Sequence, residues 1–389
     1  MFQRIASPLA RGLVGSLIAA SALSWGQAAQ AAPMSINIVD VAGNLALTQK
    51  AFEQFEKTHP GLVHFTYSTS PAPQLLPRIR AMEHAGRSDI NMVLTGTDDL
   101  AFGIQQGLWQ QLLPGYAGQL PGIPRDYSPG AARMQDLAKG YGVEVVYSPA
   151  GPLLEYNPQT VKHPPRTPQQ LLSWCQAHPG KFIYARPNNS GPGRAWLMAL
   201  PYLLHDSNPR DPVHGWTKTW AYLKQLNACI AYYPSGTGDV MKELGQQTRW
   251  MTPTITGWDI NPRKLGIVPK DFQVQKLDHM VWLNDAQYMV IPKGQSPAQV
   301  DMLLRVMRYM MKPTQQAMTY DDGYFYPGPA IAGVRLSMAP ASSQQVIREY
   351  GRKDYDAWIA KYPNKTPLNA SAMVKAFEMW NQQIGALKH

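Results

Sequence analysis

The sequence predicts an α/β fold, because short apolar stretches alternate with amphipathic ones from residue 35 onward. Ile36, Ile38 and Val39 have the pattern of a buried strand, and Leu45, Phe52 and Phe55 fall on one face of a following helix. Further strands are expected at 62–67 and 90–94, and further helices at 75–85 and 98–104. The stretch 90–94 is almost wholly apolar, which is typical of a parallel sheet covered on both faces. This βαβαβα order favours a layered α/β architecture.

The pattern changes near Tyr141, which predicts a second domain. Two strands are expected at 143–147 and 152–158, leading away from the first domain. The sequence then predicts helices at 169–177, 194–204, 216–226 and 239–245, with strands at 181–185 and 229–233. The chain is expected to return through strands at 280–283 and 286–291. Helices at 300–311 and 373–384 follow, the second capped by Asn369.

Residues 1–32 have the pattern of a secretory signal peptide. Arg4 and Arg11 supply the positive region, 12–23 the apolar core, and Ala29-Gln30-Ala31 a small-residue cleavage site. The apolar run is too short for a stable membrane anchor. No cysteine follows the signal, so a lipid anchor is not expected. The sequence therefore predicts a soluble periplasmic protein.

The charge and the cysteines restrict the partners. The formal charge is +10, and it falls to +8 without Arg4 and Arg11. Because the Lys and Arg residues are scattered, a nucleic-acid partner is not expected. Cys175 and Cys229 are the only cysteines. In an oxidising compartment they form either a disulfide or two buried thiols, and the sequence leaves both open.

Two glycine-bearing turns, 188–194 and 235–239, are candidate ligand sites because each opens a helix. Free N–H groups at a helix start, together with Ser or Thr hydroxyls, favour anions. The candidates are Ser190, Gly191, Arg194, Ser235 and Thr237. Alternatively these are ordinary strand-to-helix turns. Arg194 can hold a carboxylate or phosphate bidentately, or it is a surface residue; in the first case Arg194→Ala should weaken binding with little loss of stability.

An aromatic and acidic set suits a cation, since ring faces and carboxylates both attract positive charge. Its members are Trp258-Asp259, Trp282-Leu283-Asn284-Asp285, Tyr288 and the segment Gly323-Tyr324-Phe325-Tyr326-Pro327-Gly328-Pro329. The alternative is that these aromatic rings pack in the core. Trp282 and Asp285 are the strongest of the set because they lie where the chain returns between domains.

Catalytic and metal motifs are lacking. The sequence contains no HExxH, no Gly-x-Ser-x-Gly and no Walker loop. Tyr232 and Tyr233 are adjacent, as in ferric-ion binders, but neighbouring side chains on a strand point to opposite faces. No catalytic residue, metal or cofactor is therefore expected, and iron stays a minor alternative.

Four segments together resemble the periplasmic substrate-binding proteins of ABC importers, in the branch that includes polyamine, thiamine and ferric-ion binders. They are the Phe-x-x-Phe-Glu-Lys helix at 52–57, Glu155-Tyr156-Asn157-Pro158, the Ser-Gly-x-Gly-Arg turn at 190–194, and 281–285 followed by 290–294. The polyamine binders have an acid in a Trp-x-Asp segment. Here the acid, Asp285, lies one place further from Trp282.

The resemblance implies a type II periplasmic-binding-protein fold, with two α/β lobes and a ligand cleft between them. Lobe one would comprise 33–140 and 285–326, and lobe two 141–284 and 327–389 with the C-terminal helices. Lobe one would contribute Asn44, Ser70, Thr97, Asp98 and Tyr288 to the site. Lobe two and the hinge would contribute Ser190, Gly191, Arg194, Ser235, Thr237, Trp258, Trp282 and Asp285.

The implied function is capture of a small polar or charged solute by lobe closure, and its delivery to an ABC permease in the inner membrane. The solute would be polyamine-like, zwitterionic or anionic, and the protein a monomer. Two alternatives remain: a secreted α/β enzyme that uses cleft carboxylates, and a sensor subunit of the same fold.

Overall fold

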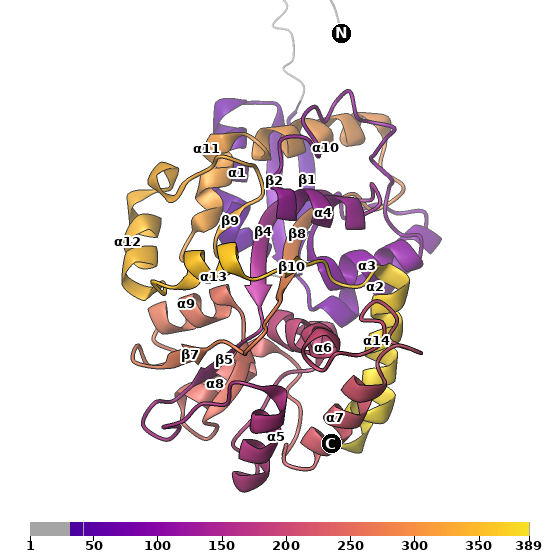
Figure 1. Ribbon diagram of the computed structural model, residues 1–389. Helices are drawn as coiled ribbons and strands as arrows, with labels where there is room; N and C mark the ends of the chain where they lie inside the picture. The colour runs from indigo at the N-terminus through magenta and orange to yellow at the C-terminus, as the bar shows by residue number, and fades with distance from the viewer. Residues whose placement is uncertain (1–31, 42, 389) are drawn as a thin grey trace, which may run out of the picture. The chain divides into compact units, whose positions relative to one another are not determined.

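The computed structural model describes residues 32–41 and 43–388 (Figure 1). The proposed signal peptide, 1–32, lies outside these residues except for Ala32. Within them, no helix is long and apolar enough to cross a membrane.

The larger of two sheets has seven strands, in the order β2-β1-β3-β8-β4-β9, with β10 also paired to β8. Its first three strands are parallel, as the apolar stretch at 90–94 predicts, whereas β8 runs antiparallel to both β3 and β4. The strands are β1 (Met34–Asp40), β2 (Val63–Thr69), β3 (Met92–Gly96), β4 (Val143–Gly151), β8 (Trp282–Val290), β9 (Gly328–Pro329) and β10 (Asn364–Lys365).

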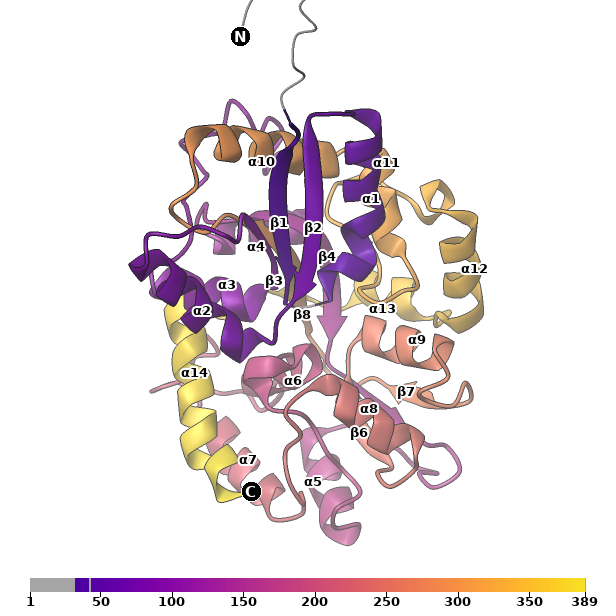
Figure 2. The ribbon, with the colours of Figure 1, turned by 180° about the vertical axis from the view of Figure 1, so that it is seen from behind.

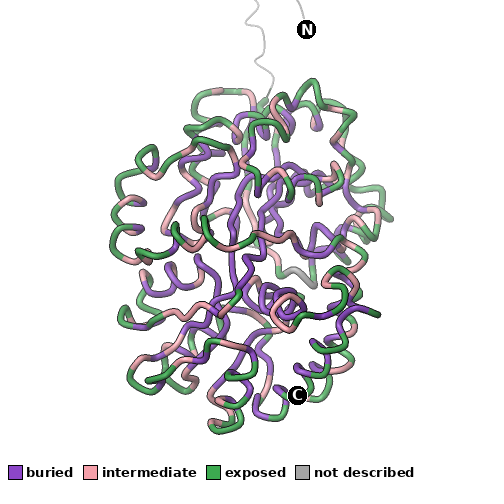
Figure 3. Tube along the Cα trace, in the orientation of Figure 1, coloured by how far each residue is buried: buried purple, intermediate pink, exposed green. Residues whose placement is uncertain are grey.

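Helices cover both faces of this sheet (Figures 1 and 2). Side chains alternate along β1, so that Ile36 and Ile38 join the core under α1 and α10, while Val39 packs on the other side. The first face carries α1 (Asn44–Thr58) and α10 (Pro297–Met310), followed by the short α11 (Pro313–Gln316). The second carries α2 (Ala72–His84), α3 (Thr97–Gln105) and α4 (Pro129–Leu137). Because both faces are covered, the central strands are buried along their length (Figure 3).

The smaller sheet has three strands, in the order β6-β5-β7: β5 (Leu153–Tyr156), β6 (Met251–Thr254) and β7 (Gln273–Gln275). The helices around it are α5 (Pro168–Ala177), α6 (Gly191–Leu203), α7 (Thr217–Asn227), α8 (Thr237–Gly245) and α9 (Thr256–Lys264). Trp196, Trp216 and Phe182 are fully buried in its core.

The strands expected at 181–185 and 229–233 are wrong. Only Phe182 forms a bridge, with Met251, and the second segment joins no sheet. Both segments run through the core, which explains their apolar sequences. An apolar run shows burial, but it does not show whether a neighbour supplies a continuous hydrogen-bond ladder.

Strands β4 and β8 link the two sheets, because β4 leads into β5 and β8 follows β7. They pair antiparallel from Val143 opposite Met289 to Gly151 opposite Leu283. The structure confirms the strand expected from residue 143, which is β4. In place of the two strands expected at 280–283 and 286–291 it has one continuous strand, β8.

The structure contains a disulfide between Cys175 and Cys229, with their Cα atoms 5.8 Å apart. It joins the end of α5 to the segment just after α7. This settles the question that the sequence left open.

The C-terminal segment carries α12 (Ala341–Tyr350), α13 (Tyr355–Lys361) and α14 (Ala370–Gln383). As expected, Asn369 caps α14, its side chain accepting a hydrogen bond from the amide of Ala372 at 3.0 Å. The helix packs against α3, with the rings of Phe377 and Phe102 6.1 Å apart. The C-terminal helix therefore supports an element near the start of the chain.

A buried charge cluster anchors α12 and α13. Asp259, on α9, is fully buried and accepts hydrogen bonds from Arg263, Arg352 and Tyr355. Glu155 lies beside this cluster with both carboxylate oxygens buried. Burial and the charge of Asp259 hold the pKa of Glu155 well above its usual value.

Candidate functional site

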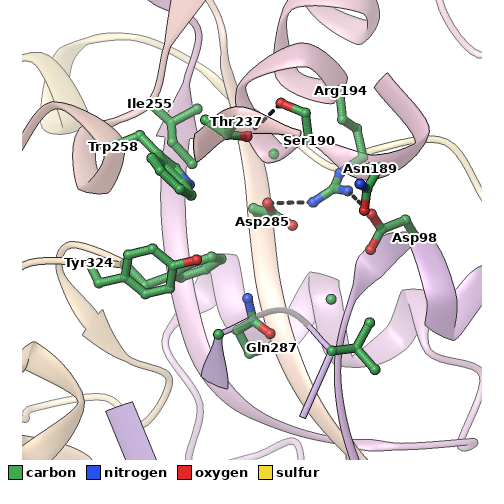
Figure 4. Close-up of a pocket in the computed structure, with 15 residues that line it drawn as sticks. Asp98, Asn189, Ser190, Arg194, Thr237, Ile255, Trp258, Asp285, Gln287 and Tyr324 are labelled. Atoms are coloured by element: carbon green, nitrogen blue, oxygen red, sulfur yellow. Dashed lines mark hydrogen bonds and ion pairs between the residues drawn. The ribbon is translucent and has the colours of Figure 1, made fainter. Parts of the chain in front are cut away.

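A pocket of about 210 Å³ lies where strand ends and helix starts from both sheets meet (Figure 4). Its lining comes from segments far apart in the sequence: Val41, Gly43, Gly96, Asp98, Asn189, Ser190, Gly191, Arg194, Thr237, Ile255, Trp258, Asp285, Gln287, Tyr324 and Phe325.

Five helices begin at this pocket. The lining includes the residue just before α1, α3, α6 and α9, and the first residue of α8. The first turn of a helix leaves backbone N–H groups unpaired and carries partial positive charge. The convergence therefore creates a positive potential, which explains why carboxylates are stable there.

Arg194 lies in the first turn of α6 and bridges two carboxylates (Figure 4). Its Nη2 donates a hydrogen bond to Asp285 Oδ2 at 2.6 Å, and its Nη1 lies 2.7 Å from Asp98 Oδ2. The three side chains are between 8% and 13% exposed. Asp98 comes from α3 and Asp285 from β8, so this charged triad, Asp98–Arg194–Asp285, joins three separate elements.

Asp285 is held from two sides. Besides Arg194, its Oδ1 accepts hydrogen bonds from the Thr97 hydroxyl at 2.9 Å and the Ala286 amide at 3.0 Å. A carboxylate with this many donors keeps one orientation. Thr97 is therefore a positioning residue behind the pocket.

The two glycine-bearing turns lie side by side. The hydroxyls of Ser190 and Thr237 are 2.8 Å apart, and Ser190 also caps α6 by accepting from the Gly193 amide at 3.0 Å. No side chain caps α8, so its first amides stay available. This part of the pocket consequently offers hydroxyls and backbone donors to a ligand.

An aromatic wall faces the triad. The rings of Trp258 and Tyr324 meet edge to face, with centroids 5.5 Å apart. The backbone of Tyr324 passes so close to α9 that a Cβ on Gly257 would lie 1.9 Å from its carbonyl oxygen. Only glycine fits there, so the approach that positions the wall depends on Gly257.

The structure brings seven of the thirteen predicted residues to the pocket: Asp98, Ser190, Gly191, Arg194, Thr237, Trp258 and Asp285. Six lie outside the lining. Asn44 is buried in α1, Ser70 follows β2, and Thr97 is behind Asp285. Ser235 is exposed, its carbonyl accepting from Asn189. Trp282 and Tyr288 are core residues that donate to the carbonyls of Trp358 and Met134.

Sequence reasoning missed Val41, Gly43, Gly96, Ile255 and Gln287. Three of these could have been found, because Gly43, Gly96 and Ile255 directly precede helices. Asn189 lies in the candidate turn 188–194, and Tyr324 and Phe325 lie in the candidate segment 323–329, although none of the three was named as a ligand contact.

The expectation that Arg194 can be removed with little loss of stability does not fit its position. The residue is 6% exposed and pairs with two carboxylates. Without it, those carboxylates would remain together and unpaired, which is unfavourable. An effect on binding must therefore be separated from an effect on folding.

Asp99, next to Asp98, makes stability depend on pH. Burial and the charge of Asp98 raise the pKa of its carboxyl to about 8. Between about pH 4 and 8 the folded state therefore holds a proton that the unfolded chain has released, so stability falls as the pH rises. We expect Asp99→Asn to remove this contribution, at most about 4 kcal/mol between pH 5 and pH 8.

Urea denaturation of both proteins at pH 5 and pH 8 checks this expectation. Glu144 and Glu155 also have raised pKa values, but they are present in both proteins, so the difference isolates Asp99. An equal loss of stability with pH in both would contradict the assignment.

Among the described residues, no group of three or more His, Cys, Asp or Glu side chains is placed to hold a metal ion. The adjacent tyrosines diverge: the Tyr232 hydroxyl bonds Glu243, and that of Tyr233 donates to Asn227 at 2.9 Å. Neither lines the pocket.

The profile of the family described as bacterial extracellular solute-binding protein matches residues 50–347. The chain belongs to this family, which confirms the resemblance seen in the sequence and the solute-binding function that it implies. No curated protein sequence matches the chain.

Solved structures of the same fold confirm the type II architecture. A putative spermidine/putrescine ABC transporter protein from Listeria monocytogenes has 14% identity and a TM-score of 0.60, over 89% of this chain and 99% of its own. A protein described as a GABA receptor has 14% identity and a TM-score of 0.64, over 91% and 99%. The apo ferric ion-binding protein A of Pasteurella haemolytica has 13% identity and a TM-score of 0.59, over 91% and 97%.

Proposed function

We propose that this protein is the periplasmic component of an ABC importer, which captures a small charged solute in the pocket and delivers it to a permease in the inner membrane. The observation that carries the proposal is the charged triad, because it joins α3, α6 and β8 around the cavity. A solute that contacts this triad would favour the closed arrangement of the two lobes.

The lobes are proposed to divide as the sequence suggests, with 33–140 and 285–326 in one and 141–284 and 327–389 in the other. The Asp98–Arg194 ion pair would then cross from lobe one to lobe two. The crossing strands β4 and β8 would form the hinge, since hinges are often a few residues that link two packed units.

The solute is proposed to be compact. The pocket volume of about 210 Å³ lies below the range of about 300 to 1,000 Å³ that is typical of ligand pockets. Carboxylates and aromatic rings suit an amine, while Arg194 and the open helix starts suit an anion. The neighbours include proteins described as binding spermidine or putrescine, GABA and ferric ion, so their names alone do not select one class.

A thermal-shift panel on ligand-stripped protein tests the function. It should contain polyamines, amino acids, organic acids, thiamine and its phosphates, sugar phosphates and ferric ion. A true ligand at 100 times its dissociation constant should stabilise the protein by about 2.7 kcal/mol.

The matched control is Gly191→Leu. A Cβ on Gly191 would make ordinary contacts with Asp285 and Ile255, so the rest of the leucine side chain would enter the pocket. We expect this variant to fold and to lose the shift. If a ligand still raises the melting temperature of Gly191→Leu, that ligand binds outside the pocket. If no compound in the panel stabilises the wild-type protein, the result counts against solute capture.

A further inference from the structure

The two carboxylates of the charged triad are held differently. Asp285 accepts hydrogen bonds from Arg194, Thr97 and the Ala286 amide. Among the described residues, the Asp98 carboxylate contacts Arg194 Nη1 alone, and the buried N–H groups of Nη1 are poorly aligned with it. Asp285 is therefore expected to stay paired with Arg194 when a ligand binds, whereas a ligand group can replace Asp98.

A buried guanidinium N–H without an aligned acceptor is unfavourable, so Nη1 is a binding position for an incoming acceptor. Arg194 and Asp98 both line the pocket, so a ligand that displaces the Asp98 carboxylate reaches Nη1 from the cavity. The displaced carboxylate then loses its contact with Arg194.

The charges decide which ligand can do this. The triad carries one positive and two negative charges. An anion alone would raise the local negative charge and leave Asp98 unpaired. A cation alone would pair with Asp98 but leave Nη1 without an acceptor. A zwitterion satisfies both groups, and the number of ion pairs rises from two to three with no change in net charge.

We propose that the solute is a compact zwitterion whose carboxylate replaces Asp98 on Arg194 Nη1 while its ammonium group binds the released Asp98. This inference rests on the proposed function, and it names the solute class. Trp258 and Tyr324 lie across Asp285 from the Arg194–Asp98 pair and would cover the carbon chain between the two charged groups (Figure 4).

Isothermal titration with matched probes tests the exchange. The zwitterionic probes are amino acids with an unbranched chain of two to six carbons, including 4-aminobutanoate. The single-charge probes are butanoate and butylamine, and the like-charge probes are butanedioate and 1,4-diaminobutane. We expect at least one zwitterion to bind on the order of 100-fold more tightly than every other probe, since each lost charged hydrogen bond weakens binding by about tenfold or more.

The variant Asp98→Asn should reverse the preference. It keeps the side-chain shape, removes the partner of the ammonium group and leaves Arg194 available to a lone carboxylate. Affinity for the best zwitterion should fall about tenfold or more, while affinity for butanoate should rise. Asp285→Asn is the comparison variant: it should weaken the binding of both without a gain for butanoate.

The outcomes separate this inference from the proposed function. Tighter binding of 1,4-diaminobutane or butanedioate than of any zwitterion would overturn the exchange but keep solute capture. A ligand found in the thermal-shift panel, together with no binding by the zwitterions, would also overturn the exchange but keep solute capture. An equal loss for zwitterion and butanoate in Asp98→Asn would show that Asp98 only supports the fold.

Discussion

Replacing Asp259 by Ala is expected to lower the free energy of unfolding by about 3 to 5 kcal/mol, because it leaves two buried guanidinium groups without their common carboxylate. Arg263 contacts Asp259 at 2.8 Å and Arg352 contacts it at 2.6 Å. The Tyr355 hydroxyl donates to the same carboxylate at 2.5 Å.

The effect should be largest where the C-terminal segment meets α9. Arg263 lies on α9, whereas Arg352 and Tyr355 belong to the segment that carries α12 and α13. Loss of the shared carboxylate therefore removes three hydrogen bonds between them, while the bond from Arg263 to the Tyr350 carbonyl remains. Hydrogen exchange should show faster opening of 341–361 than of the seven-stranded sheet.

Equilibrium urea denaturation measures the loss. The control is Asp278→Ala, which removes a carboxylate that pairs with Arg166 at 2.9 Å but is 34% exposed. Exposed pairs contribute about 0 to 1 kcal/mol, so this control should change little. A loss below about 1 kcal/mol in Asp259→Ala would mean that the cluster adds no net stability.

Removing the disulfide should have an effect of similar size. The double variant Cys175→Ala with Cys229→Ala opens a loop with a sequence separation of 54 residues. Loop-closure entropy gives a loss of about 4 kcal/mol, since the unfolded chain regains the freedom that the cross-link had removed.

Urea denaturation with and without a thiol reductant checks this value. The reductant should destabilise the wild-type protein by a similar amount and leave the double variant unchanged. Equal stability of wild type and double variant in the absence of reductant would show that the cross-link contributes nothing.

Patterns within single segments predicted most of the fold. The periodicity at 45–55 and 300–311, and the cap at Asn369, depend on near neighbours in the chain, and the structure confirms a helix at each. The failures at 181–185 and 229–233 have one cause. Strand formation depends on a partner far away in the sequence, which local apolarity does not reveal.

The same distinction between local sequence patterns and contacts with distant segments applies to the pocket residues. Ser190, Arg194 and Thr237 were predictable because a helix start has a recognisable sequence. Trp282 was misleading, since β8 directs it into the core, where its indole donates to the Trp358 carbonyl at 3.0 Å. Gln287 gave no signal, because only the meeting of β8 with the other segments places it at the cavity.

The packing of α14 sets an order of assembly. A chain is synthesised from its N-terminus, so 370–383 emerge after α3 and after the smaller sheet. Phe377 then packs on Phe102 of α3, and Trp380 donates to the Tyr184 hydroxyl at 3.1 Å in the core around the smaller sheet. The helix that presents Asp98 thus gains its supporting neighbour only after α14 has been synthesised. A nascent chain that ends before Ala370 lacks this support, so the final placement of α3 depends on the synthesis of a segment more than 200 residues further along the chain.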